Sequence, residues 1–282
     1  MKNPQVSVLV HTKNSARTIT KHLDSIANQS YRSIEIIVVD NNSADNTINI
    51  AKKYTKLIYN YGPERSAQRN YAAKKSSGQY LLVPDSDMLL SKDVVKDCVK
   101  TMMENTSLKA VIIPEKSIGE GFWARCKALE RSYYEDLDWM QAARFFESKV
   151  FNSMGGYDEA NTGTEDYDLP QRIKRKYGEK SIGSIKEYIY HDEGNLSFWY
   201  SVKKKFYYSK SLGVYKKGNF LELYKQGNVI RRYFLFFTKP KKLFANPLVG
   251  FGMLFMKTGE FTAEALAYFL YKKKLNKSYE KK

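Results

Sequence analysis

The sequence predicts an α/β fold in which helices cover both faces of a mostly parallel sheet. Short runs rich in Val, Ile and Leu alternate with segments of helical periodicity over the first 113 residues. The strand-like runs are continuously apolar, as expected for strands that are buried on both faces. The chain has 282 residues, of which 43% are hydrophobic. That is enough for a large core, and it excludes a wholly disordered chain.

The expected elements follow one another with short connections. Apolar and β-branched runs predict strands at 6–10, 34–39, 57–59, 80–83 and 110–113. Apolar residues at helical spacing predict helices at 19–27, 45–54, 65–75 and 94–102. After about residue 115 the pattern becomes irregular and longer helical stretches follow. We therefore expect the regular α/β layering in the first part of the chain.

Charge divides the chain into two parts. The net charge is +17, and residues 203–282 contribute 19 basic and 4 acidic side chains, or +15. The first 202 residues carry the remaining +2. This predicts a near-neutral domain at 1–202 and a basic, aromatic, helical C-terminal region at 203–282. Such a region attracts phosphates, whether in nucleic acids, nucleotides or anionic lipid headgroups.

The C-terminal region favours a membrane surface as its partner. Its longest uncharged run, Leu243–Met256, has 14 residues and is too short to span a bilayer as a simple helix. Apolar blocks between Lys and Arg are typical of interfacial segments, although a helical subdomain packed on the rest of the chain is the alternative. No helix-turn-helix, zinc-finger or RNP-like signature points to nucleic acid.

The N-terminal apolar run is too short for a signal peptide, and Cys98 and Cys126 form no disulfide framework. Both observations indicate a reducing compartment. We therefore expect a cytoplasmic protein that is peripheral at the cytoplasmic membrane face.

Acidic residues follow two of the predicted strands. Asp40 ends the second strand, and Asp85 and Asp87 follow the fourth. In such sheets, ligands bind beyond the carboxyl ends of the strands. Neither a GxGxxG nor a GxxxxGK[ST] motif follows the first strand, which argues against a dinucleotide site or a P-loop. Asp85 and Asp87 suit Mg²⁺ or Mn²⁺ together with phosphate oxygens, and His191 is a candidate further ligand that would favour Mn²⁺.

A second acidic cluster begins a later predicted helix. Glu165, Asp166 and Asp168 lie within four positions, after a Gly-Gly segment at 155–156. Helix capping accounts for one or two acids at a helix start, but three beside a glycine-rich approach suggest a further role. A carboxylate in this position is a candidate general base.

Taken together, these residues resemble family 2 of the inverting glycosyltransferases, whose members have the GT-A fold. The resemblance covers most of residues 6–215, and five motifs occur in the family's order. The matching segments are Val6–Asn14, Ile36–Thr47, Ala67–Asn70 with Gly78–Leu82, the acids Asp85 and Asp87, and Gly155–Asp158 with Glu165–Leu169. The chain departs from the usual pattern at His11-Thr12 and at Pro84, but neither departure removes a catalytic group.

The resemblance implies a site for the donor nucleotide. Asp40 would bind the base, and Asp85 would lie at the ribose or near the metal. Arg69 would help to hold the donor. The remaining residues assigned to the donor are Thr12, Asn14 and Asn42.

The resemblance also implies the chemistry. Asp87, with His191, would bind Mn²⁺ or Mg²⁺. Asp166 would deprotonate the acceptor hydroxyl, with Glu165 as its neighbour or alternative. The metal would stabilise the departing diphosphate while the acceptor attacks from the opposite face, inverting the sugar.

The expected partners are a nucleotide-sugar donor, preferably a UDP-sugar, and a lipid-linked or glycan acceptor at an anionic membrane surface. Two alternatives remain open. A nucleotidyltransferase also uses acidic metal ligands, although it normally has a glycine-rich loop after its first strand, and here that segment reads His11–Ser15. A non-catalytic protein could instead bind membranes or nucleic acid through the basic region.

Overall fold

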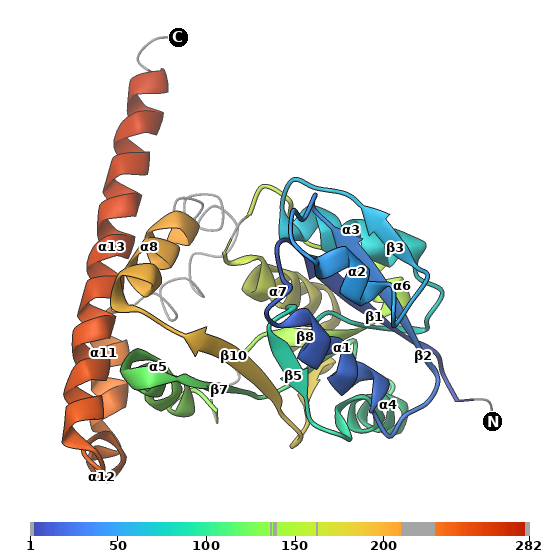
Figure 1. The fold of residues 1–282 in the computed structure, drawn as a ribbon, viewed down its shortest axis with the longest axis horizontal. Helices are drawn as coiled ribbons and strands as arrows, with labels where there is room; N and C mark the ends of the chain where they lie inside the picture. The colour runs from blue at the N-terminus through green and yellow to red at the C-terminus, as the bar shows by residue number, and fades with distance from the viewer. Residues whose placement is uncertain (1–2, 136, 138–139, 162, 210–228, 280–282) are drawn as a thin grey trace. The chain divides into compact units, whose positions relative to one another are not determined.

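The computed structural model describes residues 3–135, 137, 140–161, 163–209 and 229–279 (Figure 1). The chain forms two compact units, each assembled from separate stretches of sequence. The first comprises residues 1–116, 141–159 and 165–192, and the second comprises 117–140, 160–164 and 193–282.

A seven-stranded sheet forms the centre of the first unit. Its order is β3-β2-β1-β4-β8-β6-β9. Strand β8 runs antiparallel to β4 and β6, and the other pairings are parallel, as the sequence predicted for most of the sheet. The strands are β1 (Val6–Thr12), β2 (Ile34–Asp40), β3 (Ile58–Asn60), β4 (Tyr80–Leu82), β6 (Ala110–Ile112), β8 (Ala143–Glu147) and β9 (Ile182–Ser184).

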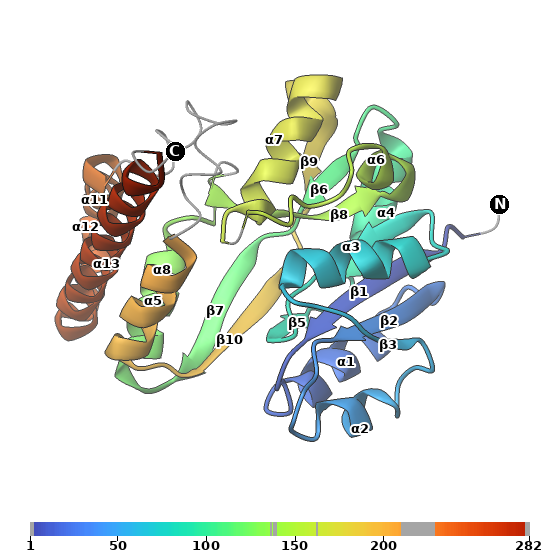
Figure 2. The same cartoon turned by 90° about the horizontal axis from the view of Figure 1, so that it is seen from above.

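Helices cover both faces of this sheet, which confirms the predicted layering (Figure 2). Alternate residues of β1 enter different cores: Val8 packs with residues of α1 and α4, whereas Leu9 packs with residues of α3 and α7. Both strand faces are thus buried, which explains the continuously apolar runs. The helices are α1 (Ile19–Ala27), α2 (Thr47–Ala51), α3 (Arg65–Lys75), α4 (Val94–Glu104), α6 (Ser148–Ser153) and α7 (Glu165–Tyr177).

Helix α2 is shorter than the predicted helix over 45–54. The Asp45 carboxylate accepts hydrogen bonds from the backbone N–H groups of Ala16 and Thr47, so it closes a turn instead of entering the helix. Asp commonly forms such local side-chain turns.

A second, three-stranded sheet has the order β5-β10-β7. Its strands are β5 (Met88–Leu90), β7 (Glu115–Glu120) and β10 (Ile189–Asn195). The strands named in the sequence analysis do not include these three, since β5 is very short and β7 is largely polar. The antiparallel register places His191 opposite Met88, one residue after Asp87. This sheet therefore brings together two residues that are far apart in the sequence.

The second unit is mainly helical. It contains α5 (Gly121–Ser132), α8 (Phe198–Ser209), α11 (Val229–Phe237), α12 (Pro240–Leu243) and α13 (Pro247–Tyr279). Figure 1 labels these helices. Helix α13 packs against α5 and α8. A buried cluster that includes Cys126, Phe236 and Met253 joins α5, α11 and α13. Of the helices in the described ranges, none combines the length and apolar character needed to cross a membrane.

The predicted domain boundary after residue 202 falls inside α8, and the segments at 117–140 and 160–164 group with the C-terminal helices. The helical C-terminal extension is present over the described residues. The functional division into domains 1–202 and 203–282 stays a prediction.

Candidate active site

The donor-side residues lie in two turns that follow β1 and β2. The Asp40 carboxylate is buried and accepts hydrogen bonds from Thr12 Oγ1 at 2.7 Å and from the Ser43 backbone N–H at 2.7 Å. Asn14 and Asn42 both have φ of 51°, the left-handed conformation that Asn tolerates better than most residues. Each bonds across the turns, Asn14 through Oδ1 to the Ala44 N–H and Asn42 through Oδ1 to Asn60. The two turns therefore form one hydrogen-bonded ledge.

Gln68, on α3, fixes the ends of both strands. Its Nε2 donates to the carbonyl oxygens of Thr12 at 3.0 Å and of Val39 at 2.7 Å. The side chain is buried, so these bonds are shielded from water. The helix thus holds in register the two strands that carry the ledge.

One residue further along α3, Arg69 gathers three carboxylates. Its guanidinium contacts Asp85, lies 2.9 Å from Asp166 Oδ1 and lies 3.5 Å from Glu165 Oε1. The Arg69 side chain is fully buried, and its guanidinium carbon lies 5.1 Å from the centre of the Tyr157 ring. Arg69 is therefore engaged by the protein itself, and it orients acidic groups at the end of the sheet.

Asp85 stands between two arginines and a histidine. Arg144 NH2 lies 3.3 Å from Oδ2, and His11 Nε2 lies 3.3 Å from Oδ1. Burial disfavours the charged carboxylate, but Arg144, Arg69 and His11 outweigh that effect and hold the pKa of Asp85 well below its usual range. Burial and the Arg69 charge lower the pKa of His11, although Asp85 opposes them. Asp85 is thus held ionised, with both oxygens in use by the protein.

Asp87 and His191 form the best pair of metal-ligand types in the site. His191 Nε2 lies 3.2 Å from Asp87 Oδ2, and Nδ1 lies 3.9 Å from Glu115 Oε2. Oxygen and imidazole donors suit Mn²⁺, and a carboxylate on the other ring nitrogen is a usual orienting partner. The described residues contain no ready-made cluster of three or more metal-binding side chains. Two protein ligands completed by diphosphate oxygens and water fit a divalent ion that comes with its substrate.

The two acids at the start of α7 differ sharply in exposure. The Glu165 side chain is fully buried between Arg65 and Arg69. The Asp166 side chain is 18% exposed, with Oδ1 on Arg69 and Oδ2 3.8 Å from Arg144. Geometry therefore favours Asp166 over Glu165 as the group that can reach a substrate.

All ten candidate site residues lie in the first unit, at or near the carboxyl ends of its strands. The sequence analysis did not find Arg144 or Glu115. Arg144 Nε donates to Glu115 Oε1 at 2.6 Å, so this pair links Asp85 and Asp166 to His191. A signal for Arg144 was present, because it is the lone charge in the apolar run Ala142–Phe146.

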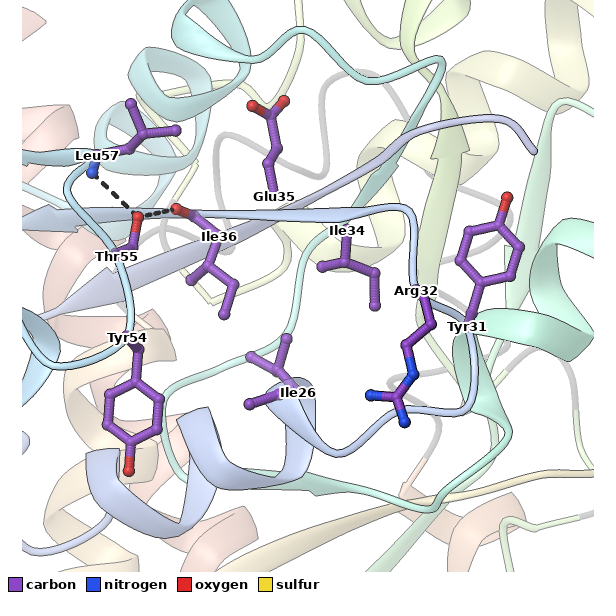
Figure 3. A pocket seen from close by; sticks show the side chains of 10 residues that line it. Ile26, Tyr31, Arg32, Ile34, Glu35, Ile36, Tyr54, Thr55 and Leu57 are labelled. Atoms are coloured by element: carbon purple, nitrogen blue, oxygen red, sulfur yellow. Dashed lines mark hydrogen bonds between the residues drawn. The ribbon is translucent and has the colours of Figure 1, made fainter. Parts of the chain in front are cut away.

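A cavity of about 350 Å³ lies elsewhere in the first unit. Figure 3 shows Ile34 and Ile36 of β2 facing Ile26 and Tyr54 there, with Glu35 directed to the opposite side of the strand. Ile34 begins β2 and Asp40 ends it, so strand geometry separates the two ends by about 20 Å. The cavity is therefore distinct from the acidic site.

The mostly parallel sheet, with acidic side chains after its strands, has the GT-A fold that is typical of glycosyltransferases. The model of the family "Glycosyl transferase family 2" matches residues 7–162, more than half of the chain. The chain therefore belongs to glycosyl transferase family 2.

Similar curated proteins are also glycosyltransferases. The poly(ribitol-phosphate) β-N-acetylglucosaminyltransferase TarS of Staphylococcus aureus is 35% identical over 111 residues, which is 36% of this chain and 19% of TarS. The putative glycosyltransferase EpsH of Bacillus subtilis is 32% identical over 114 residues, 38% of this chain and 33% of EpsH. The matched part thus spans about a fifth to a third of these relatives.

Two solved structures have the same fold over nearly the whole chain. The mannosyltransferase PcManGT of Pyrobaculum calidifontis, in complex with GDP-Man and Mn²⁺, has a TM-score of 0.62 at 15% identity and covers 94% of this chain and 87% of its own. A fragment of S. aureus TarS with UDP-GlcNAc has a TM-score of 0.53 at 18% identity and covers 93% and 90%. Membership of this family favours a glycosyltransferase over the nucleotidyltransferase and non-catalytic alternatives.

Proposed function

We propose that the protein transfers a sugar, with inversion, from a UDP-sugar to a hydroxyl or phosphate of a lipid-linked or glycan acceptor at an anionic membrane surface. The observation that carries this proposal is a continuous line of contacts between the candidate metal pair and the candidate base. It runs from Asp87 to His191, Glu115, Arg144 and Asp166, with successive separations of 3.2, 3.9, 2.6 and 3.8 Å.

The nucleoside is held on the ledge formed by the turns after β1 and β2. Thr12 and Ser43 orient the Asp40 carboxylate, which then accepts a hydrogen bond from the base. Asn14 and Asn42 fix the shape of the turns from their left-handed positions. Arg69 holds Asp85 in place and acts on the donor through it, since Arg69 itself is fully buried.

The diphosphate lies at the Asp87–His191 pair, which would hold Mn²⁺ or Mg²⁺. When bound, the ion supplies a Lewis acid that offsets the charge developing on the leaving diphosphate. Glu115 Oε2 lies 3.9 Å from His191 Nδ1, and Nε2, which faces Asp87, would be available for coordination. The metal seen with the mannosyltransferase neighbour supports this assignment, as does the nucleotide sugar seen with the TarS fragment.

Asp166 takes the acceptor proton as the hydroxyl attacks. Arg69 and Arg144 hold its carboxylate in one orientation, and its partial exposure leaves it within reach of a substrate. Glu165 neutralises Arg65 and Arg69 from inside the protein and keeps the start of α7 in place.

Two observations support an anionic acceptor or surface. The region 203–282 carries a net charge of +15, and the relative TarS is named for action on poly(ribitol-phosphate), a phosphate polymer. Basic side chains raise the local concentration of such polyanions and of anionic lipids alike. The active chain would then work peripherally at the cytoplasmic face of the membrane.

Calorimetric titration with UDP and then GDP, each with and without Mn²⁺, tests the donor site. We expect UDP to bind only in the presence of Mn²⁺. Asp87→Ala should abolish this binding, whereas Asp97→Ala, which removes a carboxylate from α4, should leave it intact. Binding of neither nucleotide under any condition would contradict the proposal. Preference for GDP would retain the site and change the donor.

A further inference from the structure

Helix α13 has its charged side chains on the inner face and its large apolar side chains on the outer face. Between Pro247 and Leu270 its charged side chains are Lys257, Glu260 and Glu264. Lys257 and Glu260 are buried, and Glu264 is half-buried against Lys205 of α8 at 3.1 Å. The exposed positions of this stretch carry no charge. An ordinary surface helix in water has the opposite arrangement, with charges outside and apolar groups inside.

The inward charges are satisfied within the second unit. Lys257 Nζ donates to Glu130 and lies 2.8 Å from Glu260 Oε2. Lys127 lies 2.8 Å from Glu130 Oε2 and 3.1 Å from Glu260 Oε1. Arg232 of α11 lies 3.7 Å from Glu130. The helices thus pair their charges with one another, which leaves the outside of α13 free of them.

The outward face is long and mainly apolar. Its most exposed large side chains lie three or four residues apart or multiples of these, so they form one stripe, which the exposed Thr258 and Thr262 interrupt. From Leu248 to Leu270 the stripe is about 33 Å long at the rise of an α-helix. Its members are Leu248, Phe251, Phe255, Leu266, Phe269 and Leu270, each at least 52% exposed.

Helix α11 repeats this pattern on a smaller scale. Ile230, Phe234 and Phe237 are exposed at spacings of four and three residues, while Arg232 between them is buried. Exposed aromatic stripes of this size are uncommon on proteins that stay in water. Helices α11 and α13 of the second unit therefore both present large apolar side chains outward, and each buries charged side chains, although Arg231 of α11 is exposed.

Exposed cations precede this apolar face in the chain. Arg231 lies near the start of α11, Lys239 between α11 and α12, and Lys241 within α12, which is followed by α13. Aromatic side chains next to Lys and Arg match the interface of a bilayer, with rings at the acyl boundary and cations at headgroup phosphates. The charge complementarity selects anionic lipid as the occupant of the face.

We propose that the outward faces of α13 and α11 insert into the interface of an anionic bilayer, with the cations of α11 and α12 on the headgroup phosphates. This deepens, and for its purpose rests on, the proposed function at a membrane. Inward charge pairing makes insertion possible, because no charged group of Pro247–Leu270 has to enter the apolar layer.

Co-sedimentation of the full chain with vesicles tests the inference. The probes are vesicles of phosphatidylcholine alone and of phosphatidylcholine with phosphatidylglycerol. We expect binding to the mixed vesicles that falls at least about tenfold in Phe251→Asp/Phe269→Asp, because each change removes a ring and adds a charge at the interface. Met103→Asp places one aspartate at a 47% exposed position on α4, away from the proposed face, and leaves binding unchanged.

A second pair of variants separates the two contributions. Lys239→Gln/Lys241→Gln weakens binding to the mixed vesicles and removes their preference over phosphatidylcholine. Phe251→Leu keeps most of the binding. Thermal melting checks that every variant is folded. We expect all of them to fold, because the substituted side chains are exposed or lie outside the buried clusters.

Three results would overturn the inference. The first is that the wild type does not bind the mixed vesicles, and the second is that Phe251→Asp/Phe269→Asp binds them equally well. The third is that light scattering shows a wild-type dimer that does not bind vesicles and that the two aspartates dissociate. The last would assign the face to a second copy of the chain. UDP titration uses the other unit, so the failure of either proposal is recognised separately.

Discussion

The two units each contain a cluster of buried charges built around one shared residue. In the first unit Arg69 serves Asp85, Glu165 and Asp166. In the second unit Glu130 serves Lys127, Lys257 and Arg232. We call these the Arg69 cluster and the Glu130 cluster. Both place one charge among several of opposite sign, but the sign of the shared residue is reversed.

The clusters differ in which sign of charge reaches the surface. In the Arg69 cluster the side chains of Asp85 and Asp166 are each 18% exposed, so carboxylates form its edge. In the Glu130 cluster the side chains of Glu130, Lys257 and Glu260 are at most 3% exposed, whereas Lys127 is 18% and Arg232 11% exposed, so cations form its edge. Buried charge therefore has two structural effects here. The Arg69 cluster fixes the orientation of two partly exposed acids, and the Glu130 cluster keeps the charges of α13 away from its outer face.

The largest expected difference between the clusters is the effect of a substitution on enzymatic activity. Asp166→Asn should lower kcat by about 10²–10⁴-fold, because an amide cannot take the acceptor proton. UDP binding should persist, as the change leaves the donor ledge untouched. Glu104→Gln, at an exposed acid at the end of α4, serves as the control and should keep near-normal turnover. Full turnover in Asp166→Asn would remove the base assignment.

Substitutions at different members of the Glu130 cluster should change the free energy of unfolding by different amounts. Glu130→Gln leaves three cations with Glu260, so it should reduce the free energy of unfolding by about 3–5 kcal/mol. Burial and Arg232 lower the pKa of Lys257 to about 8 although Glu130 and Glu260 oppose them, so its charge is held at a cost. Lys257→Met should therefore change stability by only about 1 kcal/mol. Urea unfolding measures both, and the reverse order would contradict the account.

The pH dependence should reveal a buried histidine next to the Arg69 cluster. His22 contacts the Met88 carbonyl through Nδ1, and burial lowers its pKa to about 4, while Met88, Asp87 and Asp85 act in the opposite direction. Between pH 6.5 and 4 the unfolded state binds the extra proton, so stability should fall on acidification by up to about 1.4 kcal/mol per pH unit.

His22→Asn keeps a donor for Met88 and should flatten much of this slope. His11, whose pKa is also lowered, contributes in the same direction. Below pH 3.8 the stabilisation from Asp85 is lost as its depressed pKa is approached, and this loss should remain in the variant. Urea unfolding from pH 7 to 3 checks both parts. An unchanged slope in His22→Asn would show that other groups cause it.

The smallest effect is expected where a charge pair reaches the surface. Lys205 and Glu264 lie 3.1 Å apart, with side chains 34% and 20% exposed. Lys205→Gln should lower the free energy of unfolding by less than about 1 kcal/mol. A loss as large as that of Glu130→Gln would mean that the Glu130 cluster extends to the surface of α8.

Much of the first unit follows from its sequence. The helix predicted at 65–75 has those bounds in the structure, and the strands at 34–40 and 58–60 lie within a residue of their expected places. Asp40 and Asp87 could be assigned to a site because the carboxyl ends of parallel strands share one edge. Here local periodicity and the sheet agree.

The contacts among the other site residues depend on pairings that no local pattern encodes. Glu115 begins β7 and His191 lies in β10, and the small sheet that joins them contains a three-residue strand, β5. The burial of Glu165 beside the exposed edge of Asp166 likewise depends on α3, almost a hundred residues earlier. Long-range contacts, and not residue type, decide which of two neighbouring acids can act.

Three carboxylates contact the same arginine, Arg69, and this affects how the sequence of the site can evolve. A substitution at Asp85, Glu165 or Asp166 alters the field felt by the other two, so their effects will not add. Variants of these positions should therefore be tolerated in combinations more readily than singly. The turns around Asp40 lie outside this arrangement, so the effects of substitutions there should add to those in the Arg69 cluster.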